Sequence, residues 1–566
     1  MKVVIVGGVA GGASAAARIR RLDEFAEIVV FERTDFISYA NCGLPYYIGG
    51  VIEDEEALFL QTPQRFWERF NIKVRVRHEV IAIDPTQKTV TVYSSDTKTT
   101  YEEQYDKLLL SPGAKPAIPA VPGIENNKIF TLRTVEDTLA IKAFLDRHSC
   151  RNITIIGGGF IGLEMAENLV KKQRNVTIIE ASDHLLGPLD SDMASIVHSV
   201  VRNHNIHLML QSKVIGFEQI GKDLFIQTAD QQTIQADMVL LCIGVIPDTK
   251  LAQTANLELG IKGSIVVDEQ MRTSVTDIYA VGDAVEIKHA ISGQKTLIQL
   301  AGPANKQGRI AADNICGIAS KYPGAQGTSV LKFFDWTIAS TGINERQAKE
   351  AKSNYDRIVL SPLSHAGYYP GATTMTIKVL YDRSTLHILG AQIIGKDGVD
   401  KRIDVLATAM KAGLKGPELA ELDLAYAPPY ASAKDPIHFI GYMIENIATG
   451  KVKQFHYEEI DSLKQKGVTL LDTRTISEYK SGNIDGSIHI PLDELRQKMA
   501  QIPKDKPVYI LCHSGLRSYL ACRILMQNGY DCYNLSGGYR FYEMIVKGKK
   551  QPENTLACGI PKEELQ

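Results

Sequence analysis

The sequence has little of what marks secreted, membrane-bound or nucleic-acid-binding proteins. Its 8 cysteines lack the paired spacings of a disulfide framework, which favours a reducing compartment and predicts a cytoplasmic protein. It has no uninterrupted run of about 18 apolar residues, so no membrane span is expected. The net charge is −2 and no basic run stands out, so no nucleic-acid partner is expected, and no metal site is expected either.

The N-terminal segment is apolar but lacks the charged leader of a secretory signal. It is better explained by a buried strand over 2–6 that runs into a glycine turn. The 566 residues far exceed the roughly 250–300 at which a single hydrophobic core stops growing, which predicts three or four domains. With 44% apolar and 23% charged residues, the composition is typical of a globular protein.

A first glycine-rich loop, Gly7–Gly12, follows the apolar strand and precedes an alanine-rich helix start. A second apolar strand, Ile28–Phe31, ends at Glu32. This order forms the βαβ unit that binds a dinucleotide, in which the acid holds a ribose hydroxyl. Val9 stands where the usual G-x-G-x-x-G motif has its middle glycine, so this loop alone is also compatible with a plain α/β turn.

A second glycine-rich loop fits the motif better. Strand Ile153–Ile156 leads into Gly157–Gly162 and a helix, and the next strand, Val176–Ile179, ends at Glu180. The glycines allow a tight turn and close approach of the backbone to a pyrophosphate at the helix N-terminus. A carboxylate at Glu180 accepts hydrogen bonds from a free 2′-hydroxyl and repels a 2′-phosphate. The loop therefore favours NADH over NADPH, although NADPH stays possible.

Three further segments belong with the two loops. An apolar strand over Ile278–Val281 ends in Gly-Asp at Asp283, and Ser111–Ala114 and Cys242–Pro247 are short glycine- and proline-containing stretches. As a set, these motifs resemble the pyridine nucleotide–disulfide oxidoreductases over about residues 1–450. The resemblance implies that Asp283 holds the ribityl chain of FAD and that the two short stretches cross between the FAD and NAD domains.

The same resemblance implies the residues that contact FAD and NADH. They are Gly7, Ala10, Gly11, Gly12, Glu32, Arg33, Val80, Ser111, Gly113, Gly157, Gly159, Ile161, Gly162, Glu180, Gly244, Asp283 and Ala301.

A single cysteine, Cys42, follows the first βαβ unit within Ser38–Tyr46. Most members of the family carry two redox cysteines four residues apart, whereas a lone thiol stores electrons as a mixed disulfide or a sulfenic acid. The alternative is a buried structural cysteine. The segment resembles the active-site peptide of coenzyme A disulfide reductases and of NADH peroxidases and oxidases. The latter usually carry a histidine in the first loop, where this chain has Val9 and Ala10, so that branch is disfavoured.

Two tyrosine-bearing segments, Tyr368–Gly371 and Ala425–Tyr430, resemble parts of the dimerisation domain of coenzyme A disulfide reductases. The resemblance implies that Tyr368 and Tyr426 of one subunit approach the active cysteine of the other. Their phenols would then donate hydrogen bonds to a leaving sulfur anion. Interface or core packing is the alternative for both.

Coenzyme A requires positive charge for its phosphates. Arg18 and Arg21 lie three residues apart on one face of the first helix, a spacing that is equally typical of a solvated face. The resemblance adds further candidate contacts to coenzyme A, which are Ser14, Ser38, Asn41, Asn305 and Lys434.

A new strand-and-helix pattern starts after Thr449. An apolar strand ends in Asp472–Arg474, another strand delivers Cys512–Ser518 before a helix begins, and Asn534–Tyr539 closes the unit. These segments resemble the rhodanese homology domain over about residues 455–548.

A cysteine at a strand end, ringed by backbone N–H groups and a helix N-terminus, has a stabilised thiolate that can hold a sulfane sulfur as a persulfide. Arg517 is expected to add positive charge. A phosphatase of the same fold needs a longer loop than the four residues between Cys512 and Arg517, so sulfur is favoured. Cys522 is expected in the core and Cys532 in packing or as a second sulfur relay, with no role for Cys150, Cys242, Cys316 and Cys558.

The predicted fold class is α/β: a two-dinucleotide-binding flavoprotein with FAD and NAD Rossmann-like domains, an α+β dimerisation domain and a C-terminal α/β rhodanese domain. The expected boundaries are 1–114 and 248–325 for the FAD-binding domain, 115–247 for the NAD(P)H-binding domain, 326–447 for the dimerisation domain, 448–455 for a linker, 456–548 for the rhodanese domain and 549–566 for a tail.

The expected activity is NADH-dependent, FAD-containing reduction of persulfides or polysulfides, coenzyme A persulfide among them, with release of sulfide. Coenzyme A is then a bound substrate or carrier, and a homodimer is expected. A pure coenzyme A disulfide reductase has no need of a domain for sulfane sulfur, so persulfide reduction ranks above coenzyme A disulfide reduction. A third alternative is a sulfurtransferase that delivers sulfur to a partner, with the flavoprotein as redox sensor.

Overall fold

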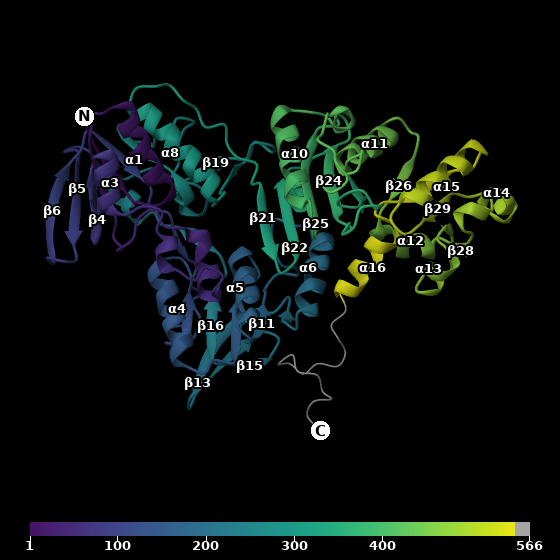
Figure 1. Ribbon diagram of the computed structural model, residues 1–566, viewed down its shortest axis with the longest axis horizontal. Coiled ribbons are helices and arrows are strands. Elements are labelled where there is room, and N and C mark those ends of the chain that lie inside the picture. Colours follow the sequence, from purple (N-terminus) through teal and green to yellow (C-terminus); the bar gives the residue numbers. More distant parts are fainter. Residues whose placement is uncertain (550–566) are drawn as a thin grey trace. The chain divides into compact units, whose positions relative to one another are not determined.

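A computed structural model describes residues 1–549; residues 550–566, with Cys558 and all but the first residue of the predicted tail, lie outside it. The chain forms two compact units. The first comprises Met1–Asp183 and Asn205–Gly327, and the second comprises His184–His204 and the described chain from Thr328 onward. Figure 1 shows the helices and strands of both units.

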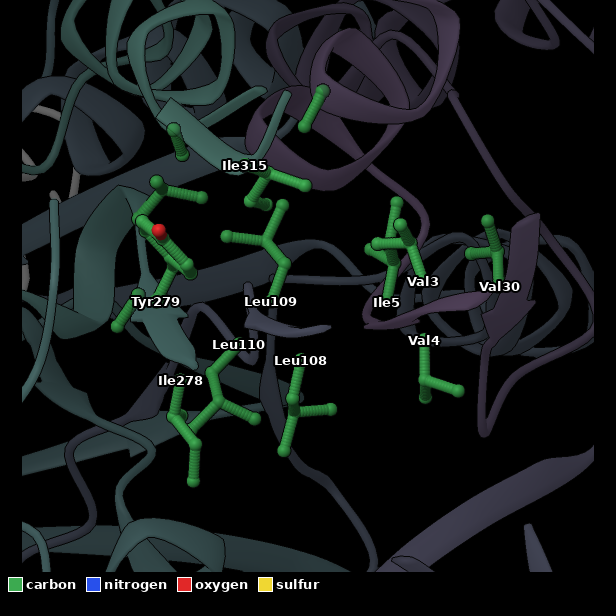
Figure 2. Packing of buried hydrophobic residues seen from close by; sticks show 14 of the residues in the cluster. Val3, Val4, Ile5, Val30, Leu108, Leu109, Leu110, Ile278, Tyr279 and Ile315 are labelled. Carbon is green, nitrogen blue, oxygen red and sulfur yellow. The ribbon is translucent and has the colours of Figure 1, made fainter. Parts of the chain in front are cut away.

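The first unit contains a five-stranded parallel sheet in the order β18-β7-β1-β2-β3. Most residues of these strands are apolar, as expected for a parallel sheet that is buried on both faces. Figure 2 shows Val3, Ile5, Leu109 and Ile278 among the fully buried side chains of this core. The strands are β1 (Lys2–Val6), β2 (Glu27–Phe31), β3 (Lys73–Arg75), β7 (Lys107–Leu110) and β18 (Ile278–Ala280).

Two helices pack closely beside this sheet. A Cβ atom at Gly308 of α8 (Ala301–Ile315) would lie 2.3 Å from the carbonyl oxygen of Gly11 in α1 (Ala10–Leu22), so glycine is required for this approach. Smaller elements complete this part: α2 (Leu44–Gly49), α3 (Pro63–Phe70), α7 (Lys250–Thr254), the antiparallel sheet of β4 (His78–Asp84), β5 (Thr89–Ser94) and β6 (Thr99–Gln104), and the pair β19 (Ile287–Lys288) and β20 (Lys295–Thr296).

A second parallel sheet in the first unit has the order β12-β11-β10-β16-β9. The two predicted crossover stretches pair with each other, since β8 and β17 form an antiparallel ribbon. The elements are α4 (Val135–Arg147), α5 (Phe160–Lys171), β8 (Ala114–Pro116), β9 (Ile129–Thr131), β10 (Asn152–Ile156), β11 (Asn175–Ile179), β12 (His207–Met209), β13 (Val214–Ile220), β14 (Asp223–Thr228), β15 (Thr233–Ala236), β16 (Met238–Leu241) and β17 (Val245–Pro247).

The second unit starts with an antiparallel sheet in the order β21-β22-β25-β24-β23. Lys378 of β24 is fully buried, and its Nζ lies 2.7 Å from Asp192 Oδ2 and 3.0 Å from Asp190 Oδ2, which ties the 184–204 segment to this sheet. The elements are α6 (Ser191–Asn203), β21 (Ser329–Phe333), β22 (Trp336–Gly342), α9 (Glu345–Glu350), β23 (Tyr355–Leu360), β24 (Thr376–Asp382), β25 (Ile388–Gly395), α10 (Val399–Ala412) and α11 (Pro436–Ala448).

The last sheet is parallel, in the order β26-β30-β29-β27-β28. Its elements are β26 (Lys453–Phe455), α12 (Ile460–Gln465), β27 (Thr469–Asp472), α13 (Ile476–Lys480), β28 (Ile488–His489), α14 (Leu495–Lys498), β29 (Val508–Leu511), α15 (Leu516–Gln527), β30 (Cys532–Leu535) and α16 (Gly538–Lys549). The predicted α/β class is confirmed, and among the described residues no helix is long and apolar enough to cross a membrane.

Candidate redox site and candidate sulfur-carrier site

The first glycine loop fits a dinucleotide. Gly7 has a φ of +97°, and a Cβ atom at Gly12 would lie 1.9 Å from the carbonyl oxygen of Gly7. No described side chain caps the N-terminus of α1, and its first turn carries no acid, so the helix start presents free N–H groups to an anion.

The acid after β2 is held in place by the loop itself. Glu32 Oε2 accepts a hydrogen bond from the Gly8 N–H at 3.0 Å, and Oε1 accepts one from the Thr34 N–H at 3.1 Å. Asp283, in the 3₁₀ turn after β18, forms an ion pair of 2.5 Å with Arg133. The predicted FAD residues of both segments therefore lie in one unit with ordered carboxylates.

The second glycine loop repeats the arrangement. Gly157 has a φ of +106°, and a Cβ atom at Gly159 would meet nothing within 4 Å, so space is open beside the start of α5. Glu180 Oε2 accepts a hydrogen bond from the Gly158 N–H at 2.7 Å. Within the described chain α5 also lacks a side-chain cap. These features fit the pyrophosphate and ribose of NADH.

The remaining predicted cofactor residues belong to several segments of the first unit. Ala10 and Ile161 lie in the first turns of α1 and α5, and Ala301 begins α8. Others have local constraints of their own: Ser111 donates its N–H to Val6, Gly113 and Gly244 have φ of +71° and +101°, Arg33 pairs with Asp248 at 2.9 Å, and Val80 is buried on β4.

Cys42 lies in a short 3₁₀ turn, Asn41–Gly43, directly before α2, and its side chain is exposed. Partial desolvation by the surrounding protein, followed by the negative charge of Glu164, raises the pKa of the Cys42 thiol. The chain's own groups therefore favour the thiol form, and a proton acceptor is needed to generate the nucleophilic thiolate.

Two residues beside Cys42 were missed in the sequence. Tyr46 follows Cys42 by four residues, and its hydroxyl donates a hydrogen bond of 3.3 Å to Glu164 Oε1 on α5. Burial raises the pKa of Glu164 to about 7, and burial together with Glu164 raises the pKa of Tyr46 to about 12. Glu164 follows the second glycine loop directly, but nothing in the sequence shows that its helix faces the Cys42 segment.

The two predicted tyrosines meet in the second unit. The hydroxyl oxygens of Tyr368 and Tyr426 lie 2.8 Å apart, and both side chains are exposed. The buried guanidinium of Arg402 supports their loops, since it donates hydrogen bonds to the carbonyl oxygens of Ser364 and Tyr430 at 3.0 and 3.3 Å. Their approach to Cys42 stays a prediction.

The candidate coenzyme A residues fall into groups. Ser14 donates a hydrogen bond of 2.7 Å to Asn305, and Arg18 forms an ion pair of 2.8 Å with Asp313. Arg21 is exposed, as expected for a solvated helix face. The others lie apart from this pair: Ser38 and Asn41 share the Cys42 segment, and exposed Lys434 belongs to the second unit.

Cys512 follows β29 and is buried in the loop before α15. Its Sγ accepts hydrogen bonds from the Gly515 N–H at 3.1 Å and from the Ser518 hydroxyl at 3.2 Å. Gly515 has a φ of +100° and α15 begins at Leu516, within the loop and earlier than the sequence suggested. The helix N-terminus thus lies at the sulfur, and two hydrogen-bond donors point to it.

Arg517 has a partner that the sequence did not reveal. Its Nη1 and Nη2 each lie 2.7 Å from a carboxylate oxygen of Glu478, which follows Cys512's neighbouring strand β27 along the chain. This pairing lowers the pKa of Glu478 to about 2. The expected positive charge of Arg517 is therefore largely neutralised.

The other described cysteines have no comparable setting. Cys522 on α15 and Cys532 at the start of β30 are both fully buried in one apolar cluster, as expected for packing. Cys150 is buried, and Cys242 and Cys316 are half-buried. The described residues contain no group of three or more ligating side chains that fits a metal ion.

The two loops, the thiol beside them and the separate sulfur loop define a two-dinucleotide redox protein with an attached sulfur-binding domain. Residues 1–308 match Pyridine nucleotide-disulphide oxidoreductase, 328–436 match the dimerisation domain of that family, and 456–544 match the Rhodanese-like domain. The chain belongs to the pyridine nucleotide–disulfide oxidoreductase family, whose members depend on FAD and NAD(H).

Several proteins of known name are similar to this chain over most of its length. A Staphylococcus aureus (strain bovine RF122 / ET3-1) coenzyme A disulfide reductase is 38% identical over 442 residues, which are 78% of this chain and 99% of the relative. The solved structure of reduced Bacillus anthracis CoADR-RHD is 48% identical with a TM-score of 0.95, covering 96% of this chain and 98% of that one. An NAD-dependent persulfide reductase from A. fulgidus is 36% identical with a TM-score of 0.90, covering 96% and 100%.

Proposed function

We propose that the chain reduces persulfides, coenzyme A persulfide among them, at the expense of NADH and releases sulfide. The observation that carries this proposal is the presence of two thiols in different chemical settings. Cys42 is exposed beside the dinucleotide loops, whereas Cys512 is buried in a cradle of hydrogen-bond donors. The name of the A. fulgidus relative, an NAD-dependent persulfide reductase, supports the same chemistry.

The chain's residues divide the work. Gly7, Gly11, Gly12, Glu32 and Asp283 would hold FAD, and Gly157, Gly159, Gly162 and Glu180 would hold NADH. When bound, FAD supplies the two-electron transfer from NADH to the sulfur site. The Cys42 thiolate attacks the inner sulfur of a persulfide R–S–SH, which forms the Cys42–S–S–R mixed disulfide and expels HS⁻. Cys512 and Arg517 belong to the separate site that accepts sulfane sulfur.

Coenzyme A disulfide reduction is the second candidate. Cys42 is an exposed thiol without a neighbouring cysteine and can attack any accessible disulfide, and the Staphylococcus aureus relative, which matches 78% of this chain, carries that name. Tyr368 and Tyr426 would donate hydrogen bonds to the leaving thiolate in either reaction. Their action on the partner's cysteine requires a homodimer, which the dimerisation domain supports, and we place the enzyme in the cytoplasm.

The proposed activity predicts a fixed product ratio. Anaerobic turnover of coenzyme A persulfide with NADH should release one sulfide and one coenzyme A for each NADH oxidised, with NADPH a poorer donor. Coenzyme A disulfide serves as the control and should yield two coenzyme A and no sulfide. Sulfide and thiol titration beside the 340 nm absorbance measures the ratio, and persulfide consumption without NADH oxidation would favour the sulfurtransferase alternative.

We also propose that Glu164 is the proton acceptor for Cys42, with Tyr46 between them. The Tyr46 hydroxyl binds Glu164 at 3.3 Å, Cys42 is among the charges that raise the Tyr46 pKa, and Glu164 is among those that raise the Cys42 pKa, so the three groups lie near one another. The Cys42 S–H proton passes to the Tyr46 oxygen while the Tyr46 O–H proton passes to Glu164. Thiol and carboxylate thereby become thiolate and carboxylic acid.

This relay predicts a pH limb near neutrality. The pKa of Glu164 is raised to about 7, and only the carboxylate accepts a proton, so kcat/KM should rise as pH increases through about 7. Glu164→Gln should lower kcat/KM at pH 7 by about a hundredfold and move the limb to higher pH, because the Cys42 thiol must then lose its proton without this acceptor. Tyr46→Phe should behave alike, whereas the control Tyr47→Phe, whose hydroxyl binds Glu55 at 3.0 Å, should keep the limb. An unchanged profile in Glu164→Gln would refute the relay.

A further inference from the structure

The charged groups around the Cys512 loop indicate that this site distinguishes between classes of sulfur donor. We propose that Glu478 determines which sulfur donors reach Cys512: by neutralising Arg517, it admits organic persulfides and excludes compact dianions such as thiosulfate. This inference deepens the proposed function, because it rests on Cys512 being the sulfane-sulfur acceptor.

Several hydrogen bonds hold the Glu478–Arg517 pair in place. Besides the two bonds of 2.7 Å to Arg517, Glu478 Oε2 accepts hydrogen bonds from the N–H and the hydroxyl of Thr475, both at 2.9 Å. Glu478 thereby occupies the N3 position of a capping box on α13. This bidentate, charge-assisted pair with two further anchors engages both terminal nitrogens of Arg517 and offsets its charge towards an incoming anion.

A second guanidinium beside the loop, that of Arg474, is also paired with groups of the protein. Arg474 is buried with 2% of its side chain exposed, and its Nε and Nη2 bind Asp472, the latter at 2.6 Å. Its remaining donors bind the carbonyl oxygens of Glu478 and Gly482, and its guanidinium lies 3.8 Å from the centre of the Tyr539 ring. Arg474 is therefore a structural cation.

Two groups remain at the loop. Burial and the neighbouring arginines lower the pKa of His513 below its ordinary value, so its imidazole is neutral at pH 7. Arg540 donates its backbone N–H to the His513 carbonyl oxygen at 2.9 Å, and its Nη1 has no hydrogen-bond partner within the described residues. Three guanidinium groups thus lie near two carboxylates and the Cys512 thiolate, which leaves no positive charge uncompensated.

The two classes of donor differ in the charge that they bring. Thiosulfate brings two negative charges beside the sulfur, and both must leave water. Beside its sulfur a persulfide brings at most one, on the terminal sulfur itself, and therefore has the lower desolvation cost. Transfer is balanced in both cases: Cys512–S⁻ and R–S–S⁻ give Cys512–S–S⁻ and R–S⁻, whereas thiosulfate gives Cys512–S–S⁻ and sulfite.

The test measures thiocyanate formation from cyanide in the full chain without NADH, so its outcome does not depend on Cys42 turnover. Cyanide regenerates the cysteine, since Cys512–S–S⁻ and CN⁻ give Cys512–S⁻ and SCN⁻. With the uncatalysed rate subtracted, wild type should use glutathione persulfide at least about tenfold better than thiosulfate, by kcat/KM. A wild-type preference for thiosulfate would overturn the proposal without any variant.

Glu478→Gln keeps the shape and the capping position but removes the charge, and should shift the thiosulfate-to-persulfide ratio of kcat/KM at least about tenfold towards thiosulfate. Glu478→Asp keeps the charge and should leave the ratio low. In the double variant Glu478→Gln, Arg517→Gln the gain should disappear, because it depends on the released guanidinium. The control Asp531→Asn removes a carboxylate paired with Lys453 at 2.8 Å in the same domain and should not shift the ratio.

Failure here is distinguishable from failure of the proposed function. If the thiosulfate-to-persulfide ratio of kcat/KM in Glu478→Gln stays within about threefold of wild type, Glu478 does not determine selectivity, even where NADH-driven persulfide reduction is normal. Conversely, a chain that shows the shift but no NADH-driven sulfide release would keep the selectivity role and lose the reductase assignment.

Discussion

Replacing the exposed thiol beside the dinucleotide loops should abolish reduction. We expect Cys42→Ser to lower NADH-driven turnover of coenzyme A persulfide and disulfide by about a thousandfold or more, because a serine hydroxyl neither ionises near neutral pH nor forms a disulfide. FAD should remain bound, since its predicted contacts lie on the glycine loop, Glu32 and Asp283. Steady-state NADH oxidation and the flavin absorbance spectrum measure the two effects.

The matched control is Cys316→Ser, which replaces a half-buried thiol at the end of α8 in the same unit. It should retain near wild-type turnover, which separates the loss of one particular thiol from a general effect of removing sulfur. Turnover of Cys42→Ser within about tenfold of wild type would show that electrons reach the substrate by another route.

The parts of these sites that were predictable are local in sequence. Glu32 and Glu180 each end the strand that follows a glycine loop, and each accepts an N–H from its own loop. Cys512 was likewise identified from the strand before it and the helix after it. In such segments a short stretch of backbone defines the geometry, so residue order alone indicates which groups meet.

The parts that were missed depend on contacts between distant segments. Tyr46 and Glu164 are 118 residues apart, and Glu478 and Arg517 are 39 apart. A carboxylate on a helix is most often solvated, so neither acid stood out. Their roles follow from the packing of α2 with α5 and of α13 beside the Cys512 loop, which periodicity and spacing do not encode.

The sequence predicted the arrangement of strands and helices better than it predicted which charged side chains pair. The alternation of apolar strands with helices predicted both parallel sheets of the first unit and the parallel sheet that carries Cys512. The charge expected from Arg517, by contrast, depends on whether an acid lies within reach of its guanidinium. A pairing of this kind reverses the local electrostatics without altering the fold, so it is visible only in three dimensions.

Replacing the buried thiol should separate the two activities. We expect Cys512→Ser to lower sulfur transfer from glutathione persulfide to cyanide by about a thousandfold, because a hydroxyl oxygen cannot hold a sulfane sulfur. NADH-driven reduction of coenzyme A disulfide should stay within about twofold of wild type, since this small substrate reaches Cys42 by diffusion and needs no sulfur carrier. The control is Cys522→Ala, which removes a fully buried thiol from α15 at a stability cost of about 1 kcal/mol and should leave sulfur transfer intact.

If Cys512→Ser instead blocked disulfide reduction as completely as Cys42→Ser, Cys512 would be an obligatory redox relay. The two thiols would then form one site in function, and the independent roles argued from their different settings would be wrong.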